Sequence, residues 1–260
     1  MMSFKIKDIW LFRNMFMELT HRELRSKYKG SVLGFLWTYI NPLCQIVVYA
    51  FFFSMIFKSG IECFYLYLIV SMFPWNFFSG GTMQGLGAVR YQGDLVKKIF
   101  FPRQILPMVS ITVNLVNMLI SFIIIYGVLL VSGWGIDWRL QLYLLPVIFI
   151  EYLFTFGLSL ILSSIEVYFR DIEHIVSVIM MVWMYVTPMF YNLSFIPEEL
   201  LPLFKFNPML YIISMYQQIL YYKVPPQADY MVKGFLISLC MLIIGWIVFG
   251  RLEKRFAEEL

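Results

Sequence analysis

The sequence predicts an all-α polytopic membrane protein with a single domain, residues 1–260, and three observations carry this prediction. Hydrophobic residues make up 61% of the chain and charged residues 14%, whereas ordinary soluble domains contain roughly 25% charged residues. Long uncharged runs recur along the chain, and the first one, residues 30–57, has 28 residues. A helix needs only about 20 residues to cross a bilayer. Short basic segments separate the runs, and no polar linker marks a second domain.

Six segments are predicted to cross the membrane, and all of them are almost free of charge. They are residues 30–57, 63–89, 104–133, 140–165, 174–191 and 232–250. With six crossings, 15 of the 20 Lys and Arg residues lie on the side of the N-terminus, as expected for the cytoplasmic side. A seventh crossing through residues 206–222 would move the basic C-terminal tail outside. We therefore expect both termini to be cytoplasmic and residues 192–231 to form an external re-entrant region.

Residues 1–29 are predicted to form a cytoplasmic interface helix, because Phe12, Phe16 and Leu19 recur at the spacing of a helix face. Such a helix can lie in the membrane plane or pack against the protein's own cytoplasmic surface. Four basic side chains gather at its end: Arg22, Arg25, Lys27 and Lys29. They attract anionic lipid, or they bind a pyrophosphate group through several charged donors.

Residues 90–103 interrupt the apolar pattern with a basic segment, which places it in the cytoplasm. Leu95, Ile99 and Phe100 stand between charged residues, as apolar anchors do in short helices that dock into a groove of a partner. A plain surface loop is the alternative. A second charged patch contains Glu166 and Arg170, whose spacing allows an ion pair within one helix; a charged cap on two helix ends explains it equally well.

The sequence predicts no catalytic residues. It has no G-x-x-x-x-G-K-[ST] phosphate loop and no H-E-x-x-H zinc motif, and we expect no metal, no cofactor in this chain and no nucleic-acid partner. Transport work would then be driven by another subunit or by an ion gradient. Glu151 is the single acidic residue within the fourth predicted span. A proton relay normally uses several such residues, so we interpret Glu151 as a polar contact inside the bundle.

Aromatic residues are concentrated in the first and fifth spans. Trp and Tyr often form belts at the membrane interface, but aromatic faces at mid-depth also suit the stacking of sugar rings. We expect a substrate path along seven of these side chains: Trp37, Tyr39, Tyr49, Phe52, Trp183, Tyr185 and Tyr191.

Several motifs together resemble the type-2 ABC-transporter permeases that export polysaccharides such as O-antigen, teichoic acid and capsule. They are K-Y-K-G-S-V-L-G at 27–34, N-P-L at 41–43, Y-F-R-D-I at 168–172, T-P-M-F-Y at 187–191 and N-P-M at 207–209. Each motif is loose by itself, and their order and spacing carry the resemblance.

The resemblance implies the membrane subunit of an ABC exporter in the bacterial inner membrane. Such a subunit works as a homodimer with two separate ATP-binding subunits, which hold the ATP and Mg. The cargo is a lipid-linked polysaccharide, and its pyrophosphate would meet the basic cluster. Residues 90–103 would be a coupling helix, and the residues implied in coupling are Gln92, Asp94, Leu95, Lys97, Ile99, Arg170 and Asp171.

Two alternatives remain open. An integral-membrane glycan transferase needs clustered acids, and Glu198 and Glu199 form the close acid pair on the external side. A small-lipid or drug exporter would share the ABC architecture and differ in the substrate that stimulates ATP hydrolysis.

Overall fold

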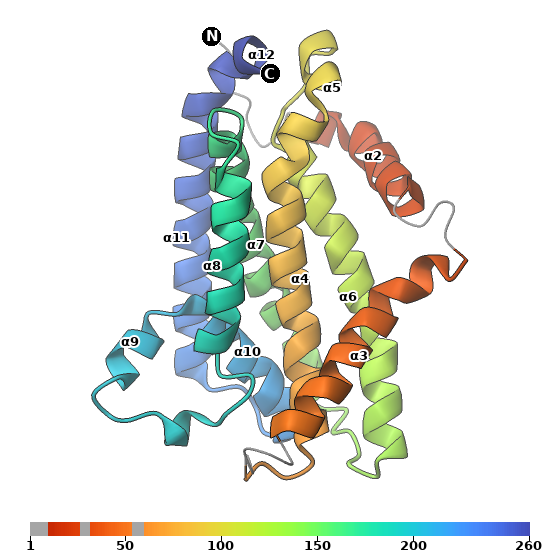
Figure 1. Cartoon of the computed structure of the whole chain (residues 1–260), viewed down its shortest axis with the longest axis vertical. Coiled ribbons are helices and arrows are strands. Elements are labelled where there is room, and N and C mark those ends of the chain that lie inside the picture. The colour runs from red at the N-terminus through yellow and green to blue at the C-terminus, as the bar shows by residue number, and fades with distance from the viewer. Residues whose placement is uncertain (1–9, 27–31, 54–59) are drawn as a thin grey trace.

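The computed structural model describes residues 10–26, 32–53 and 60–260, and these ranges form a helical bundle without a β-strand (Figure 1). The predicted all-α class is therefore confirmed. The helices are α2 (Arg13–Ser26), α3 (Trp37–Phe51), α4 (Phe64–Tyr91), α5 (Gly93–Lys98), α6 (Ile105–Val131), α7 (Leu144–Glu166), α8 (Ile172–Val186), α9 (Leu201–Lys205), α10 (Pro208–Tyr216), α11 (Ala228–Leu252) and α12 (Phe256–Glu259).

Three described segments are long and apolar enough to cross a membrane: Ile105–Val131, Leu140–Glu166 and Ala228–Arg255, with mean hydropathies of 2.3, 2.0 and 2.3. The helix α8 is apolar but has only 15 residues, and α4 has 28. A helix falls on each of the six predicted spans, so the chain is a multi-pass α-helical membrane protein. The number of crossings stays a prediction.

The helix α4 is the centre of the bundle (Figure 1), and 20 of its 28 residues are buried. It packs against α6 and α7, and α7 packs in turn along α11. Gly157 on α7 and Gly245 on α11 meet at that contact. A Cβ atom on Gly157 would lie 2.5 Å from the backbone nitrogen of Leu242, so the two backbones approach as closely as small residues permit in membrane bundles.

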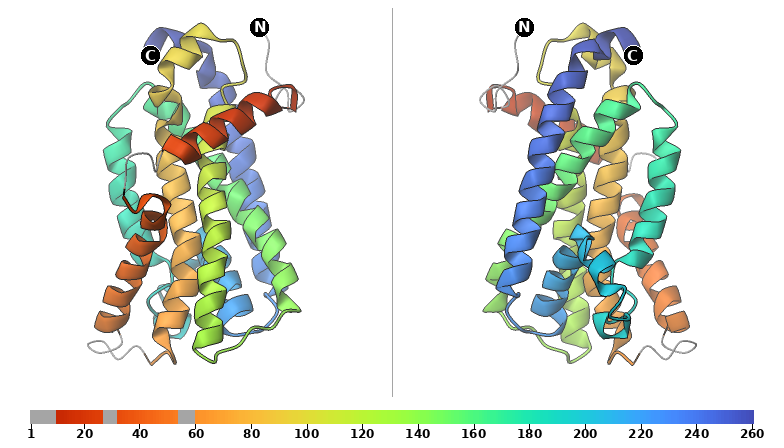
Figure 2. Two further views of the ribbon diagram at one scale, coloured as in Figure 1. Left: turned by 90° about the vertical axis from the view of Figure 1, so that its right-hand side faces the viewer. Right: turned by 90° about the vertical axis from the view of Figure 1, so that its left-hand side faces the viewer.

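The bundle has two distinct ends. The helices α5 and α12 lie together at one end, and α2 runs transversely across α4 and α6 near it (Figure 2). The helices α9 and α10 lie at the opposite end, where α8 ends and α11 begins (Figure 1). The first described helix and the last helix of the chain therefore lie towards the same end.

Residues 187–227 leave and rejoin the bundle at the end that holds α9 and α10. The helix α10 and the π-helical turn Gln217–Tyr221 add 9 and 5 residues. Together they are about 21 Å long at 1.5 Å per residue, which is too short for a hydrocarbon core of about 30 Å. The main chain here is covered by protein, because every residue from Met209 to Gln217 is buried.

Candidate functional site

The end of the bundle that holds α5 contains both predicted coupling segments. Asp94 lies in the first turn of α5, and Lys97 and Lys98 lie in the last turn, where each charge complements the helix dipole. Val96 anchors this short helix in the protein with 3% of its surface exposed.

The coupling residues predicted on α5 differ in exposure. Asp94, Lys97 and Ile99 are exposed, whereas Gln92 and Leu95 are half-buried. Arg170 and Asp171, in the link between α7 and α8, are exposed as well. A surface of mixed charged and apolar side chains results.

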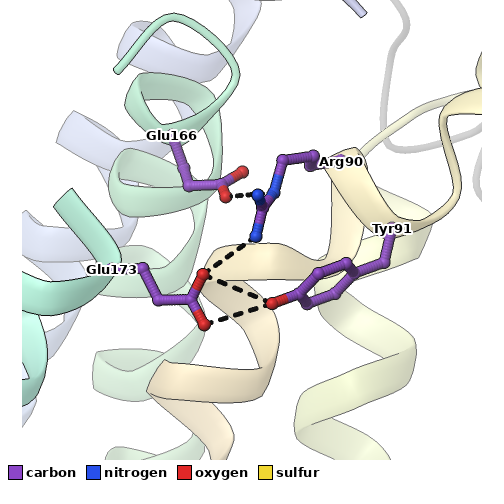
Figure 3. A network of polar contacts seen from close by, with 4 residues as sticks. All are labelled: Arg90, Tyr91, Glu166 and Glu173. Atoms are coloured by element: carbon purple, nitrogen blue, oxygen red, sulfur yellow. Dashed lines mark hydrogen bonds and ion pairs between the residues drawn. The ribbon is translucent and has the colours of Figure 1, made fainter. Parts of the chain in front are cut away.

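An ion-pair network joins three helices directly beside α5 (Figure 3). The guanidinium of Arg90, near the end of α4, lies with Nε 2.5 Å from Glu166 Oε1 and Nη2 2.9 Å from Glu173 Oε2. The hydroxyl of Tyr91 donates to the carboxylate of Glu173 at 3.1 Å. Glu166 ends α7 and Glu173 lies in the first turn of α8, so Arg90 ties the end of α4 to both of these helices.

Two interpretations were open for Glu166 and Arg170, and the structure favours charged residues at two helix ends over an ion pair within one helix. The helix α7 ends at Glu166 and α8 begins at Ile172, so the helical turn that would bring Arg170 over Glu166 is not formed. The carboxylate of Glu166 turns inward to Arg90 instead, and its side chain is fully buried.

The C-terminal residues contact the end of the bundle that holds α5. Gln104 Nε2 donates to Glu253 Oε2 at 3.0 Å, and the Arg103 guanidinium donates to the main-chain oxygen of Glu253. Burial lowers the pKa of Arg103, and the nearby Glu253 carboxylate opposes this shift. Phe256 is completely buried beneath Arg103, and α12 packs on α5.

The helix α2 is attached to the bundle by polar contacts. Ser110 of α6 donates to Glu23 Oε1 at 3.1 Å, and the amide of Gln84 on α4 donates to the same oxygen. Arg22 Nη2 donates to Gln92 Oε1 at 2.9 Å. This helix therefore packs against the protein's own surface and contacts the residue that precedes α5.

The predicted lipid-pyrophosphate cluster is described in part. Arg22 and Arg25 are exposed on α2, and Lys27 and Lys29 lie outside the described residues. The two described cations therefore stand near the α5 end of the bundle, where the transverse helix α2 lies (Figure 2).

Three of the predicted path aromatics gather at the end of the bundle that is far from α5. The rings of Tyr49 on α3 and Tyr185 on α8 lie 5.1 and 5.6 Å from the ring of Phe190. Tyr191 donates its hydroxyl to the main-chain oxygen of Tyr185 at 2.9 Å. An aromatic cluster thus links α3 and α8 across the bundle.

The other four path residues are not part of that cluster. Trp183 is half-buried. It donates its indole N–H to Asn207 Oδ1 at 2.7 Å and packs its ring against Phe78 and Phe154. Tyr39 is buried, with its hydroxyl 3.4 Å from the main-chain oxygen of Asn117. Trp37 and Phe52 are exposed. The seven side chains therefore do not line one continuous wall within a single copy of the chain.

Glu151 contacts α10, in the segment that the sequence predicts to be re-entrant. Its carboxylate is fully buried, and Tyr216 of α10 donates its hydroxyl to Glu151 Oε2 at 2.6 Å. This geometry fits the interpretation of Glu151 as a polar contact inside the bundle. Within the described ranges, no three His, Cys, Asp or Glu side chains come close enough to hold a metal ion.

Sequence reasoning missed the partners that lie far apart in the chain. Arg90 was included in the basic segment 90–103 without a partner, although Glu166 lies 76 positions further along the chain, and Glu253 was not assigned any role. Arg90 and Glu253 share one sequence signal: each is a charged residue that lies within about one helical turn after the end of a long apolar run. A polar group in that position needs a partner from a neighbouring helix end.

Comparisons with known proteins give the chain a family. Residues 14–221 match the sequence family described as ABC-2 type transporter. An O-antigen export system permease protein RfbA from Myxococcus xanthus is 32% identical over 257 residues, which are 98% of this chain and 98% of that protein. A protein of the same name from Klebsiella pneumoniae is 30% identical over 100% of both chains. The capsule polysaccharide export inner-membrane protein CtrC from Neisseria meningitidis is 24% identical over 91% of this chain and 90% of that protein.

Proposed function

Because this chain belongs to the ABC-2 type transporter family, we propose that it is the membrane-spanning subunit of an ATP-driven exporter of a lipid-linked polysaccharide of the O-antigen type. The observation that carries the proposal is similarity over the whole chain, at 32% and 30% identity, to two proteins named as O-antigen export permeases. Similarity of that extent covers both the coupling end and the external region, and not a single motif.

ATP hydrolysis is assigned to a separate subunit, which would hold ATP and Mg and dock on the α5 end. This surface presents Ile99 and Phe100, with 51% and 71% of their surfaces exposed, beside the exposed cations Lys97 and Lys98. Apolar anchors with charged flanks suit a groove on a partner protein. The buried Val96 and the contact with α12 attach α5 to the bundle, so that a movement of the partner would be transmitted to this helix.

The Arg90 network would transmit a movement of α5 to the membrane-spanning helices. Arg90 lies three residues before Gly93, the first residue of α5, and its two ion pairs connect α4 to the ends of α7 and α8. A shift of α5 would therefore act on three long helices at once. Because ion pairs with a buried member are sensitive to geometry, the network favours discrete arrangements over gradual bending.

Two copies of this chain and two ATP-binding subunits would complete the exporter, with the polymer passing between the copies. The helices α3 and α8 both expose apolar side chains such as Val47, Val48, Val178 and Val182, which suits helices that face a second copy or lipid. We place the exporter in the bacterial inner membrane with the α5 end in the cytoplasm. The positions of 15 of the 20 Lys and Arg residues support this orientation.

Reconstitution tests the proposal. The permease and its ATPase, purified together and inserted into liposomes, should hydrolyse ATP faster when the lipid-linked polysaccharide is present, and should move the polymer across the bilayer. An ATPase with an inactivated phosphate loop is the control and should abolish both activities. Stimulation by small lipids or drugs but not by the polymer would contradict the substrate assignment, and glycan transfer by the permease alone would contradict the transporter assignment.

A further inference from the structure

A partly open cavity lined by polar and aromatic side chains lies between α3, α4 and α6. Its volume is about 220 Å³. The polar side chains that line it are Thr38, Asn41, Gln45, Asn76, Asn114, Asn117 and Ser121.

The cavity lies at the middle depth of the helices that form it. Asn114 and Asn117 stand near the centre of α6, a candidate membrane span of 27 residues, and Asn76 stands near the centre of the 28-residue α4. Polar side chains at this depth face the bundle interior or a water-filled space, because hydrocarbon does not satisfy them. Five carboxamides around one cavity are therefore a feature that lipid contact does not explain.

Asn114 on the α6 wall of the cavity is held by hydrogen bonds, whereas α3 and α4 also carry amides that are free. Asn114 Nδ2 donates to Gln84 Oε1 at 2.7 Å and to the main-chain oxygen of Ser110 at 2.8 Å. On α3, Asn41 and Gln45 lie one helical turn apart and are exposed. Within the described part of the chain, the amides of Asn41, Gln45 and Asn76 form no hydrogen bond to protein. These three groups can therefore bind something that enters the cavity.

The chemistry of the lining indicates a neutral ligand rich in hydroxyl groups. A carboxamide both donates and accepts hydrogen bonds, as a sugar hydroxyl does. None of the described residues that line the cavity is charged, which argues against a phosphate or a metal ion. Tyr39, Phe73 and Phe77 supply apolar surface for the C–H face of a ring. The volume equals roughly seven waters at about 30 Å³ each, which is room for one sugar ring.

We propose that this amide cavity is a contact site for single sugar units of the exported polymer. The inference rests on the proposed function and adds a specific place to it. The site is formed within one copy of the chain and is separate from the aromatic cluster around Phe190. A few neutral hydrogen bonds hold a sugar weakly, which is what a conduit needs in order to release its cargo.

Substitution of the free amides tests the proposal in the complex of permease and ATPase in liposomes. Gln45→Leu and Asn76→Leu should each raise the polymer concentration that gives half-maximal stimulation of ATP hydrolysis by about fivefold, the equivalent of one neutral hydrogen bond. Cys44→Leu is the matched control, because Cys44 is exposed on the same helix and does not line the cavity, and it should leave this concentration and the basal rate of hydrolysis unchanged.

The wild-type complex separates failure of this inference from failure of the proposed function. If wild type responds to the polymer and both leucine variants respond equally well, the inference is wrong and the proposed function stands. If wild type itself shows no response, both are contradicted.

Thiol protection gives a second measurement on a single folded variant. With the native cysteines changed to serine, Gln45→Cys should react with a water-soluble maleimide. The reaction should slow several-fold when an excess of free oligosaccharide, released from the polymer by mild acid, is added. Leu203→Cys, at a position 66% exposed on α9 and away from the cavity, should label equally with and without oligosaccharide. Equal labelling of Gln45→Cys with and without oligosaccharide would show that the cavity holds water alone and would overturn the proposal.

Discussion

Arg90 Nε and Glu166 Oε1 lie 2.5 Å apart, and the Glu166 side chain is fully buried while 28% of the Arg90 side chain is exposed. A buried carboxylate needs its counter-ion, and here that counter-ion lies directly before the helix that we assign to coupling. The pair is thus placed where the bundle and its driving subunit would meet.

Removal of the counter-ion should destabilise the protein. Arg90→Gln leaves the Glu166 carboxylate buried and unpaired, and breaking such a pair costs about 3 kcal/mol. A lower thermal midpoint of the purified protein in detergent would show the loss. The double variant Arg90→Gln with Glu166→Gln removes the charge as well and should recover part of it. A single variant as stable as the parent would show that the pair does not hold the helix ends together.

Loss of the contact between Arg22 and Gln92 should slow export more than loss of the nearby charge of Arg25. Arg22→Ala removes a charge-assisted hydrogen bond between α2 and the residue before α5, whereas Arg25→Ala removes an exposed charge alone. We expect the first variant to export polymer several-fold more slowly than the second, in proteoliposomes with equal amounts of both complexes. A double-mutant cycle with Gln92→Ala should give a coupling energy of about 1 kcal/mol. Equal effects of the two arginines would indicate a purely electrostatic role for the cluster.

Glu151 should tolerate loss of its charge but not loss of its contact. Glu151→Gln keeps an acceptor for the Tyr216 hydroxyl, so export should continue near the wild-type rate and should not depend on a proton gradient. Tyr216→Phe leaves the buried carboxylate without its donor at 2.6 Å and should lower stability by about 1–3 kcal/mol. An export rate that collapses in a well-folded Glu151→Gln variant would instead indicate proton coupling.

The contact between α7 and α11 should not accept a side chain at Gly157. Gly157→Val places a Cβ 2.5 Å from the Leu242 backbone nitrogen, and overpacking of this kind costs about 1–3 kcal/mol or more. The measurement is the yield of monodisperse protein after solubilisation. Gly250→Val on α11 is the matched control, because nothing lies within 4 Å of its Cβ position, and its yield should equal that of the parent.

Much of the fold could be predicted from the sequence because uncharged length is a local property. The all-α class and the family follow from apolar runs and ordered motifs, and both are confirmed by the helices and by the match over residues 14–221. The side chain of Arg90 shows the limit. Its charge is visible in the sequence, but its partner depends on where α7 ends and how α8 is placed, and both are set by packing between helices.

The candidate path was harder to predict for the same reason. Aromatic residues can be counted in a sequence, yet Trp183 turns inward because its indole finds Asn207, while Tyr49 and Tyr185 meet at Phe190. The amide cavity escaped notice because its side chains come from three helices. Asn41 and Asn114 are 73 positions apart, and each looks like an isolated polar residue in an apolar run.

The central claim is that the α5 end faces the cytoplasm, where an ATP-hydrolysing subunit can reach it, and thiol labelling tests this most directly. In a chain whose three cysteines are replaced by serine, Lys97→Cys reports on α5, and Leu203→Cys, at a position 66% exposed on α9, reports on the opposite end. A membrane-impermeant maleimide should label Lys97→Cys only in inside-out vesicles and Leu203→Cys only in right-side-out vesicles. Labelling of Lys97→Cys in sealed right-side-out vesicles would contradict the account.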